Sequence, residues 1–162
     1  MLHSQMAGSG DNNNAFDFVL SKMRRGTEPP PHVHSREDEF IYVLSGAITV
    51  FVDGEVFPVK AGECVFLPRR KPHGWVIMSA EIQVILLVTP GGFYDAFNTM
   101  SVPAERMELP SEVDSVSYAK IDLTETIKVS AEYGTRFLTP DELETEMPEF
   151  ARTRLLAQTL VR

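Results

Sequence analysis

The sequence has little cysteine, no long apolar stretch and few basic side chains. Cys64 is the only cysteine among the 162 residues, so the chain has no internal disulfide and suits a reducing compartment. Nowhere do about 18 apolar residues run together, as a membrane-spanning helix requires. Residues 1–14 lack the basic region and the apolar stretch of a signal peptide. We therefore expect a cytoplasmic protein.

Acidic side chains dominate the charge. Asp and Glu number 23 against 15 Lys and Arg, which gives a formal net charge of −8. Binding to a polyanion needs a basic surface, and we interpret the short basic run at residues 69–71 as a solvated turn. We therefore expect neither a nucleic-acid partner nor a membrane partner. A small-molecule substrate is the expected ligand of a single domain this size, which can bury a real core.

Short β-branched and aromatic segments, separated by turn residues, run from residue 15 to about residue 90. This pattern is typical of a sandwich or a barrel. Asp53-Gly54 between two apolar runs predicts a hairpin, because both central residues of a type I′ turn need positive φ. Residues 47–52 are apolar on both faces, so both faces need cover. The rest of the chain or a second subunit could cover the outer face, and we expect a homodimer.

Three parts follow from these patterns. We expect a polar N-terminal segment at residues 1–14, part of it a loose terminus, and a β-barrel at residues 15–98. Residues 99–162 should form a connection and then C-terminal helices that pack on the barrel or on a partner subunit.

Helix signals appear after the last apolar segment. A short helix is expected at about residues 93–100. Asp122 starts a second helix with a capping-box pattern, and Gly134 sits where a C-terminal glycine should. Pro140 suits the first position of a third helix.

Three of the four histidines, with one glutamate, form the most informative pattern in the chain. His32 and His34 are two apart, a spacing that puts both side chains on one face of an extended segment. Glu39 opens an apolar strand, where a carboxylate is costly unless it is paired or bound to a cation. His73 begins another strand. Two histidines with this spacing and no further ligand nearby are more often solvent-facing. Four such donors, however, could converge on one metal ion.

Glycines and a proline extend this pattern into two longer motifs. The first reads G-x5-H-x-H-x4-E-x6-G from Gly26 to Gly46, and the second reads G-x5-P-x-R-x2-H from Gly62 to His73. These spacings resemble the two conserved motifs of the cupin superfamily. Cupins usually have a glycine where this chain has Arg70. That position is not a metal ligand in the family, so the departure concerns the geometry of the turn.

The chain resembles, more narrowly, the small bacterial single-domain cupins that are commonly labelled quercetin 2,3-dioxygenase-like. This resemblance rests on PPPHVHSREDEFIYVLSG at residues 29–46, on VTPGGF at residues 88–93 and on the AEYG that ends at Gly134. It implies an all-β fold, the cupin double-stranded β-barrel or jelly roll, with a small helical C-terminal appendage.

The resemblance also implies a metal site and an activity. His32, His34, Glu39 and His73 would hold one divalent transition metal ion, which could be Fe, Mn, Ni, Co, Cu or Zn. In flavonol dioxygenases of this type the glutamate also takes a proton from the substrate hydroxyl. Glu39 would then be both ligand and general base, and dioxygen would attack an aromatic or enolic substrate. The alternatives are a non-catalytic binding or sensor protein, and a metal-dependent isomerase or lyase on the same site.

Five other residues near these motifs have plainer interpretations. Asp38 is the only substitute for Glu39 as a ligand, and the glycine spacing favours Glu39. Glu37 is interpreted as a solvated charge and Cys64 as a small buried hydrophobe. Trp75 and Phe66 could line a pocket, although aromatic residues on strands are mostly core residues.

Overall fold

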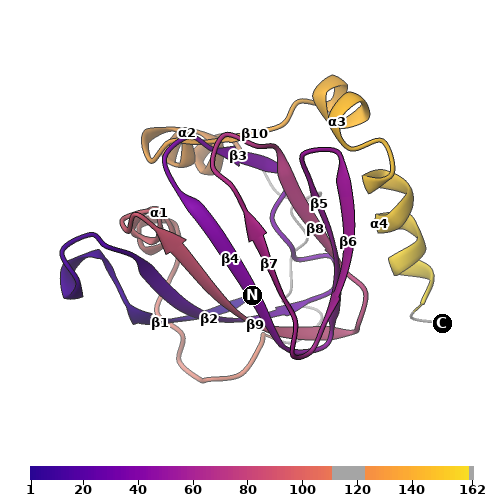
Figure 1. Cartoon of the computed structure of the whole chain (residues 1–162). Helices are drawn as coiled ribbons and strands as arrows, with labels where there is room; N and C mark the ends of the chain where they lie inside the picture. The colour runs from indigo at the N-terminus through magenta and orange to yellow at the C-terminus, as the bar shows by residue number, and fades with distance from the viewer. Residues whose placement is uncertain (111–122, 161–162) are drawn as a thin grey trace.

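The computed structural model describes residues 1–110 and 123–160, in which ten strands pair into two antiparallel sheets (Figure 1). The first sheet has the order β1 (Leu2–Ala7), β2 (Asp17–Arg24), β9 (Glu81–Thr89), β4 (Asp38–Ser45) and β7 (Cys64–Leu67). The second has the order β10 (Thr135–Phe137), β3 (His32–His34), β8 (His73–Ile77), β5 (Ala47–Val52) and β6 (Glu55–Lys60). The predicted mainly-β, jelly-roll fold class is confirmed.

Period-two alternation along the strands builds the core between the sheets. On β4, Ile41 and Val43 are buried, whereas Phe40, Tyr42 and Leu44 are each 41% exposed. Successive side chains of a strand point to opposite faces, so one face of β4 faces inward. The same alternation on the other strands joins both sheets in one apolar cluster. Glu39, two residues before Ile41 on the same strand, is therefore also directed into this interior.

The hairpin predicted at Asp53-Gly54 joins β5 to β6. The two residues have φ angles of 51° and 80°, and Val52 pairs with Glu55 across the turn. Positive φ costs glycine nothing and aspartate little, which is why this dipeptide sets the turn. The turn fixes the register of β5 and places Val50 in the core.

Helices cover the ends and one outer face of the sheets: α1 (Tyr94–Met100), α2 (Thr124–Glu132), α3 (Pro140–Glu146) and α4 (Phe150–Thr159). The helix expected near residues 93–100 is confirmed. The second helix ends as predicted before Gly134, whose φ is +85°, whereas its expected start at Asp122 lies outside the described residues. The third begins at Pro140 after Thr139, whose hydroxyl accepts a hydrogen bond from the Glu142 amide.

The C-terminal helices pack on the second sheet. Met147, Phe150 and Ala157 form a separate apolar cluster with Phe51 and Val76, on the face of β5 and β8 that points away from the main core. Figure 1 shows α4 alongside this sheet. The rest of the chain thus covers the outer face of β5, one of the two possibilities expected for it. None of the helices in residues 1–110 and 123–160 is long and apolar enough to cross a membrane.

Two short strands differ from the sequence-based expectation. Leu2–Ala7 is not a loose terminus but β1, which pairs with β2 along most of its length. Thr135–Phe137 was expected within a helical appendage, yet it forms β10 and pairs with β3. Residues from both ends of the chain therefore extend the sheets.

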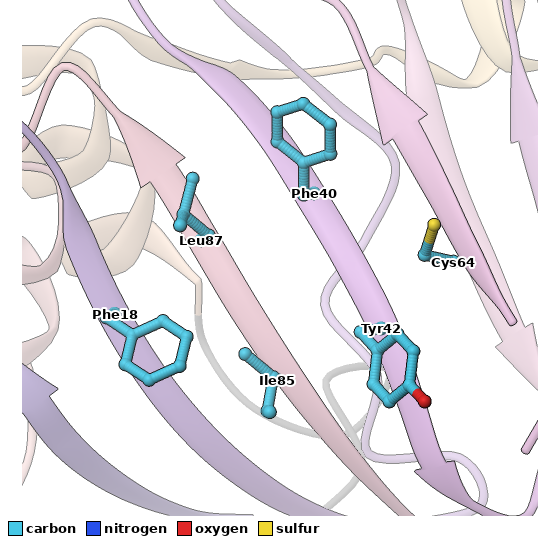
Figure 2. Close-up of a pocket in the computed structure, with 6 residues that line it drawn as sticks. All are labelled: Phe18, Phe40, Tyr42, Cys64, Ile85 and Leu87. Carbon is cyan, nitrogen blue, oxygen red and sulfur yellow. The ribbon is translucent and has the colours of Figure 1, made fainter. Parts of the chain in front are cut away.

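Cys64 was expected to be buried, and this prediction is wrong. It pairs with Tyr42 at the outer face of β4 and is exposed. Together with neighbouring apolar side chains it lines a shallow groove on the outside of the first sheet, shown in Figure 2. We call this groove the outer apolar patch, and its residues are Phe18, Phe40, Tyr42, Cys64, Ile85 and Leu87.

Candidate metal centre

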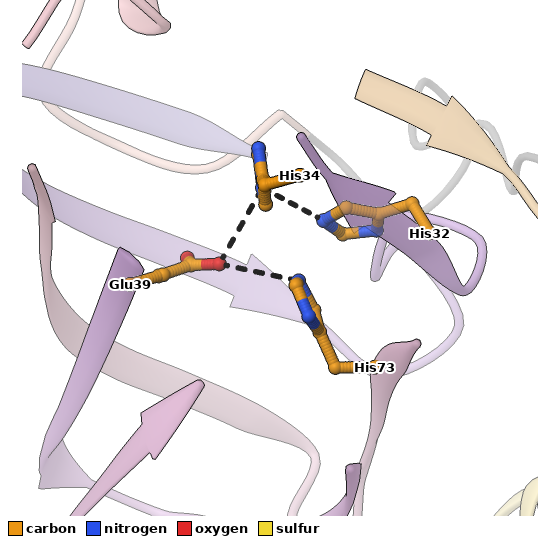
Figure 3. Close-up of side chains that lie close together, drawn as sticks. All are labelled: His32, His34, Glu39 and His73. Atoms are coloured by element: carbon orange, nitrogen blue, oxygen red, sulfur yellow. Dashed lines mark hydrogen bonds and ion pairs between the residues drawn. The ribbon is translucent and has the colours of Figure 1, made fainter. Parts of the chain in front are cut away.

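Four buried side chains from three strands converge on one point inside the jelly roll (Figure 3). His32 and His34 come from β3, Glu39 from β4 and His73 from β8. One nitrogen or oxygen of each lies within 4.8 Å of the others, and none of the four is more than 4% exposed. We refer to these residues as the His–Glu cluster. Their spacing in the sequence thus becomes proximity in space.

Strand geometry explains this convergence. His32 and His34 are both buried while Val33 between them is only partly so, as expected of side chains two apart on one face. His32 pairs directly with His73 across β3 and β8. Glu39 is at the inward-facing end of β4, two residues before Ile41.

The atoms that face one another in the cluster are nitrogen and oxygen atoms that can bind a metal ion. Nε2 of His32 is 3.2 Å from Nε2 of His34. Oε2 of Glu39 is 3.8 Å from Nε2 of His34 and 3.8 Å from Nε2 of His73. Oε2 of Glu39 and Nε2 of His73 have no hydrogen-bond partner among the described residues.

The Nδ1 atoms of His32 and His73 are occupied, which fixes the tautomers of these two residues. Nδ1 of His32 donates to the carbonyl oxygen of Pro30 at 2.8 Å, and Nδ1 of His73 donates to that of Lys71 at 3.0 Å. A carbonyl can only accept, so the proton must be on Nδ1 and the lone pair on Nε2. Nε2 of His34 is 3.2 Å from the lone pair on Nε2 of His32, so this nitrogen either donates a proton to it or shares a cation with it. Histidines that ligate metals are commonly held in this way.

Burial shifts the pKa values of His32, His73 and Glu39 so that the neutral form of each is favoured. Removal from water lowers the pKa of His73 to about 3 and that of His32 well below its usual value, with the neighbouring histidines adding to both effects. Burial raises the pKa of Glu39 to about 7, against a smaller opposing effect of His34. His32 and His73 are therefore neutral donors at pH 7. Three imidazoles and a carboxylate fit a divalent transition metal ion well.

Two acidic residues next to Glu39 in the sequence, Glu37 and Asp38, have different surroundings. Glu37 is not a solvated charge, because it is 4% exposed and its Oε2 lies 3.4 Å from Nδ1 of His34. Its place two residues before Glu39 put it on the same face of an extended chain, a signal that could have identified it. Asp38 points the other way, where hydrogen bonds from Arg69 lower its pKa. The structure thus puts Glu39, and not Asp38, in the cluster.

Aromatic side chains surround the cluster. The Phe93 ring is 4.4 Å from that of His34, and the rings of Phe137 and Trp75 are 6.0 and 6.2 Å from that of His32, between centroids. Trp75 therefore lies beside the cluster, as its interpretation allowed. Phe66 is 47% exposed on the outer face of β7 and neither lines this site nor belongs to the core.

Arg70 has the conformation that a glycine would adopt. Its φ is +64°, and its amide donates to the carbonyl oxygen of His34 at 2.6 Å. The left-handed region costs a residue with a side chain about 1 kcal/mol. We expect Arg70→Gly to keep metal affinity within about twofold and to change the free energy of unfolding by no more than about 1 kcal/mol. Metal titration and denaturant unfolding test this, and a large loss of affinity would contradict the assignment of the turn.

Two antiparallel sheets around a buried cluster of three histidines and one glutamate define a jelly-roll domain with a candidate metal centre. Residues 19–90, which include all four residues of the cluster, match the family model of the cupin domain. This match, together with the fold, supports a protein of the cupin superfamily.

Two curated relatives match parts of the chain. Quercetin 2,3-dioxygenase from Bacillus subtilis is 25% identical over 120 residues, which are 74% of this chain and 36% of that protein. Polyketide synthase CurC from Streptomyces cyaneus is 39% identical over 54 residues, which are 33% of this chain and 35% of that protein. The chain thus spans about a third of the length of these relatives.

A solved structure supports the fold. KdgF from Halomonas sp. is 29% identical and aligns with a TM-score of 0.50, over 56% of this chain and 78% of that chain. Together these similarities support a cupin metalloprotein.

Proposed function

We propose that the protein is a metal-dependent dioxygenase that acts on an aromatic or enolic small molecule of the flavonol type. The observation that carries this proposal is Glu39, a buried carboxyl with a pKa of about 7 that faces three imidazole nitrogens. General-base catalysis is most effective when the pKa of the base is near the working pH. Glu39 has this property in the metal-free protein.

His32, His34, Glu39 and His73 would hold the metal ion. When bound, the ion would supply Lewis acidity, which favours the ionised form of a hydroxyl or enol, and would promote the reaction with dioxygen. The carboxylate of Glu39 would take the proton of the substrate hydroxyl. Nδ1 of His32 and of His73 would stay bonded to backbone carbonyls, so these rings keep their orientation while the proton moves.

The surroundings of the cluster support an aromatic substrate. Phe93, Phe137 and Trp75 enclose the histidines and exclude water, and aromatic rings stack favourably on other rings. The names of the two curated relatives refer to a polyhydroxylated aromatic compound and to polyketide synthesis. Both concern molecules with acidic hydroxyl or enol groups, which is the chemistry that a base such as Glu39 requires.

Oxygen uptake tests the proposed reaction. The protein is loaded with each candidate metal and incubated with flavonols, catechols and enols in an oxygen electrode, with the chelated protein as control. We expect one molecule of dioxygen to be consumed for each molecule of one substrate class. Conversion without oxygen uptake would indicate an isomerase or lyase, and tight binding without conversion would indicate a binding or sensor protein. Either result contradicts the proposal.

Elemental analysis tests the metal site separately. We expect about one transition metal ion per chain in protein purified without a histidine tag or chelator. Absence of bound metal, even after reconstitution with each candidate ion, would overturn the assignment of the His–Glu cluster.

We also propose that the outer apolar patch is covered by a second copy of the chain. Its residues carry no charge at neutral pH, whereas the chain has a net charge of −8, so two copies can meet there without facing like charges. In a two-fold dimer the same patch of both copies would form the interface. Light scattering should give a dimer that Tyr42→Asp dissociates, whereas Val102→Asp, at an 87% exposed position elsewhere, should not affect it. A monomeric wild type at micromolar concentration contradicts the proposal.

A further inference from the structure

The strand that carries two residues of the His–Glu cluster is held mainly by the C-terminal part of the chain. β3 pairs with β8 at a single position, His32 with His73. It pairs with β10 at three positions, and two of these are the pairs Thr135 with His34 and Phe137 with His32. β10 lies well beyond residues 19–90, which the cupin family model matches.

Backbone hydrogen bonds extend this pairing at both ends of β3. The Ser35 amide donates to the carbonyl oxygen of Gly134 at 2.9 Å, and the Leu138 amide donates to that of Pro31 at 3.0 Å. Residues 31–35 are thus held along their whole length by residues 134–138, which we call the β10 segment. Figure 1 shows this segment between α2 and α3, next to β3.

Gly134 makes the close approach of the two segments possible. Its φ is +85°, and a Cβ atom there would come within 2.6 Å of the Ser35 hydroxyl oxygen. A side chain at this position would therefore be strained, and the Ser35 side chain would have to move to make room for it.

The β10 segment also contacts the His–Glu cluster through a side chain. Thr135 is 3% exposed, and its hydroxyl oxygen lies 3.0 Å from Nδ1 of His34. The Glu37 carboxylate is next to the same nitrogen at 3.4 Å. The Thr135 oxygen can accept the Nδ1 proton, and this tautomer leaves the lone pair on Nε2 of His34 to face Glu39 and His32. His34 thus lacks the backbone carbonyl partner that orients His32 and His73, and it is oriented by side chains.

Two further contacts fix the C-terminal part of the chain against the second sheet. The Arg25 guanidinium donates to the carbonyl oxygens of Met78 and Ser79 and to that of Ala157 on α4. The apolar cluster around Phe150 packs on the same face. The β10 segment, which precedes α3 and α4, is therefore anchored on the barrel.

We propose that the β10 segment is a positioning element of the metal centre, and that Thr135 sets the orientation and tautomer of the ligand His34. This inference rests on the proposed metal site. Residues that hold metal-ligating histidines typically contribute about 10- to 100-fold to metal affinity. Thr135 is then a residue that tunes the metal centre without touching the ion.

Isosteric substitution tests this role. Thr135→Val removes the hydroxyl but keeps the shape and the preference for a strand, and Thr135→Ser restores a hydroxyl. Thr49→Val, on β5 of the same sheet and on the face opposite the inward-pointing Val50, makes the same chemical change away from the cluster. Metal affinity is measured by competition with a chelator, and ligand geometry by the visible absorption spectrum of the cobalt-loaded proteins.

We expect Thr135→Val to weaken metal binding about tenfold or more and to alter the cobalt spectrum, whereas Thr135→Ser and Thr49→Val resemble wild type. Thermal unfolding of the metal-free variants checks that Thr135→Val remains folded. If it binds metal with wild-type affinity and spectrum, Thr135 has no positioning role, although the metal site stands. If the wild type itself binds no metal, the proposed function fails first.

Discussion

Glu39→Gln should lower turnover at saturating metal by about 100-fold or more, while its effect on metal affinity is smaller. Glutamine keeps an oxygen donor but cannot take a proton, and a well-placed general base contributes about 10²–10⁴ in rate. Asp38→Asn is the matched control, because it neutralises the neighbouring carboxylate, which pairs with Arg69 at the surface. An exposed ion pair of this kind contributes little to stability. Metal content and turnover are measured on the same preparations.

The pH profile distinguishes loss of the base from loss of metal. If Glu39 is the base, turnover of the wild type should change with pH as Glu39 gains or loses its proton. This change should be absent from the pH profile of the fully metal-loaded Glu39→Gln protein. Unchanged turnover and an unchanged profile at full loading would exclude a proton-transfer role for Glu39 and leave it as a ligand alone.

Removal of the metal should lower the melting temperature, and more so at pH 8 than at pH 6. The pKa of Glu39 in the metal-free fold is about 7, raised from 4.5. A carboxyl with a raised pKa stabilises the fold below pH 4.5, and this contribution is lost as pH rises through 7. At pH 8 the metal-free centre therefore holds an uncompensated carboxylate, whereas the cation compensates it in the loaded protein.

The size of this effect follows from mass action. Metal present at 100 to 1,000 times its dissociation constant stabilises the fold by about 2.7–4.1 kcal/mol. For a chain of this length, that corresponds to a melting temperature about 5–16 °C higher. In Glu39→Gln the metal-induced shift should not depend on pH between 6 and 8. A melting temperature that a chelator leaves unchanged at both pH values would contradict a metal at this site.

Local spacing explains why the cluster could be located from the sequence. His32 and His34 share a face because strands have a period of two, and the glycines around them mark turns whose φ angles the structure shows to be positive. Asp53-Gly54 was predicted for the same reason. Each of these inferences needs only a few neighbouring residues, whereas the addition of His73 to the cluster came from the resemblance to the second cupin motif.

Inferences that depended on distant partners were less successful. Cys64 is exposed because it pairs with Tyr42 on β4, and the sequence of β7 alone does not reveal which of its faces points inward. β10 is three residues long, too short for a period to be recognised, and its partner β3 lies about a hundred residues earlier. The aromatic residues around the cluster come from β8, from the residue that precedes α1 and from β10, and only the folded chain brings them together.

The contact between Thr135 and His34 spans 101 residues of sequence. Closing so long a loop is slow compared with forming the hairpins of the jelly roll. During synthesis, His32 and His34 leave the ribosome long before residues 134–138 exist. We therefore expect the completed His–Glu cluster to be among the later features of the nascent protein to form, so that tight binding of the metal ion reports that synthesis has passed residue 138.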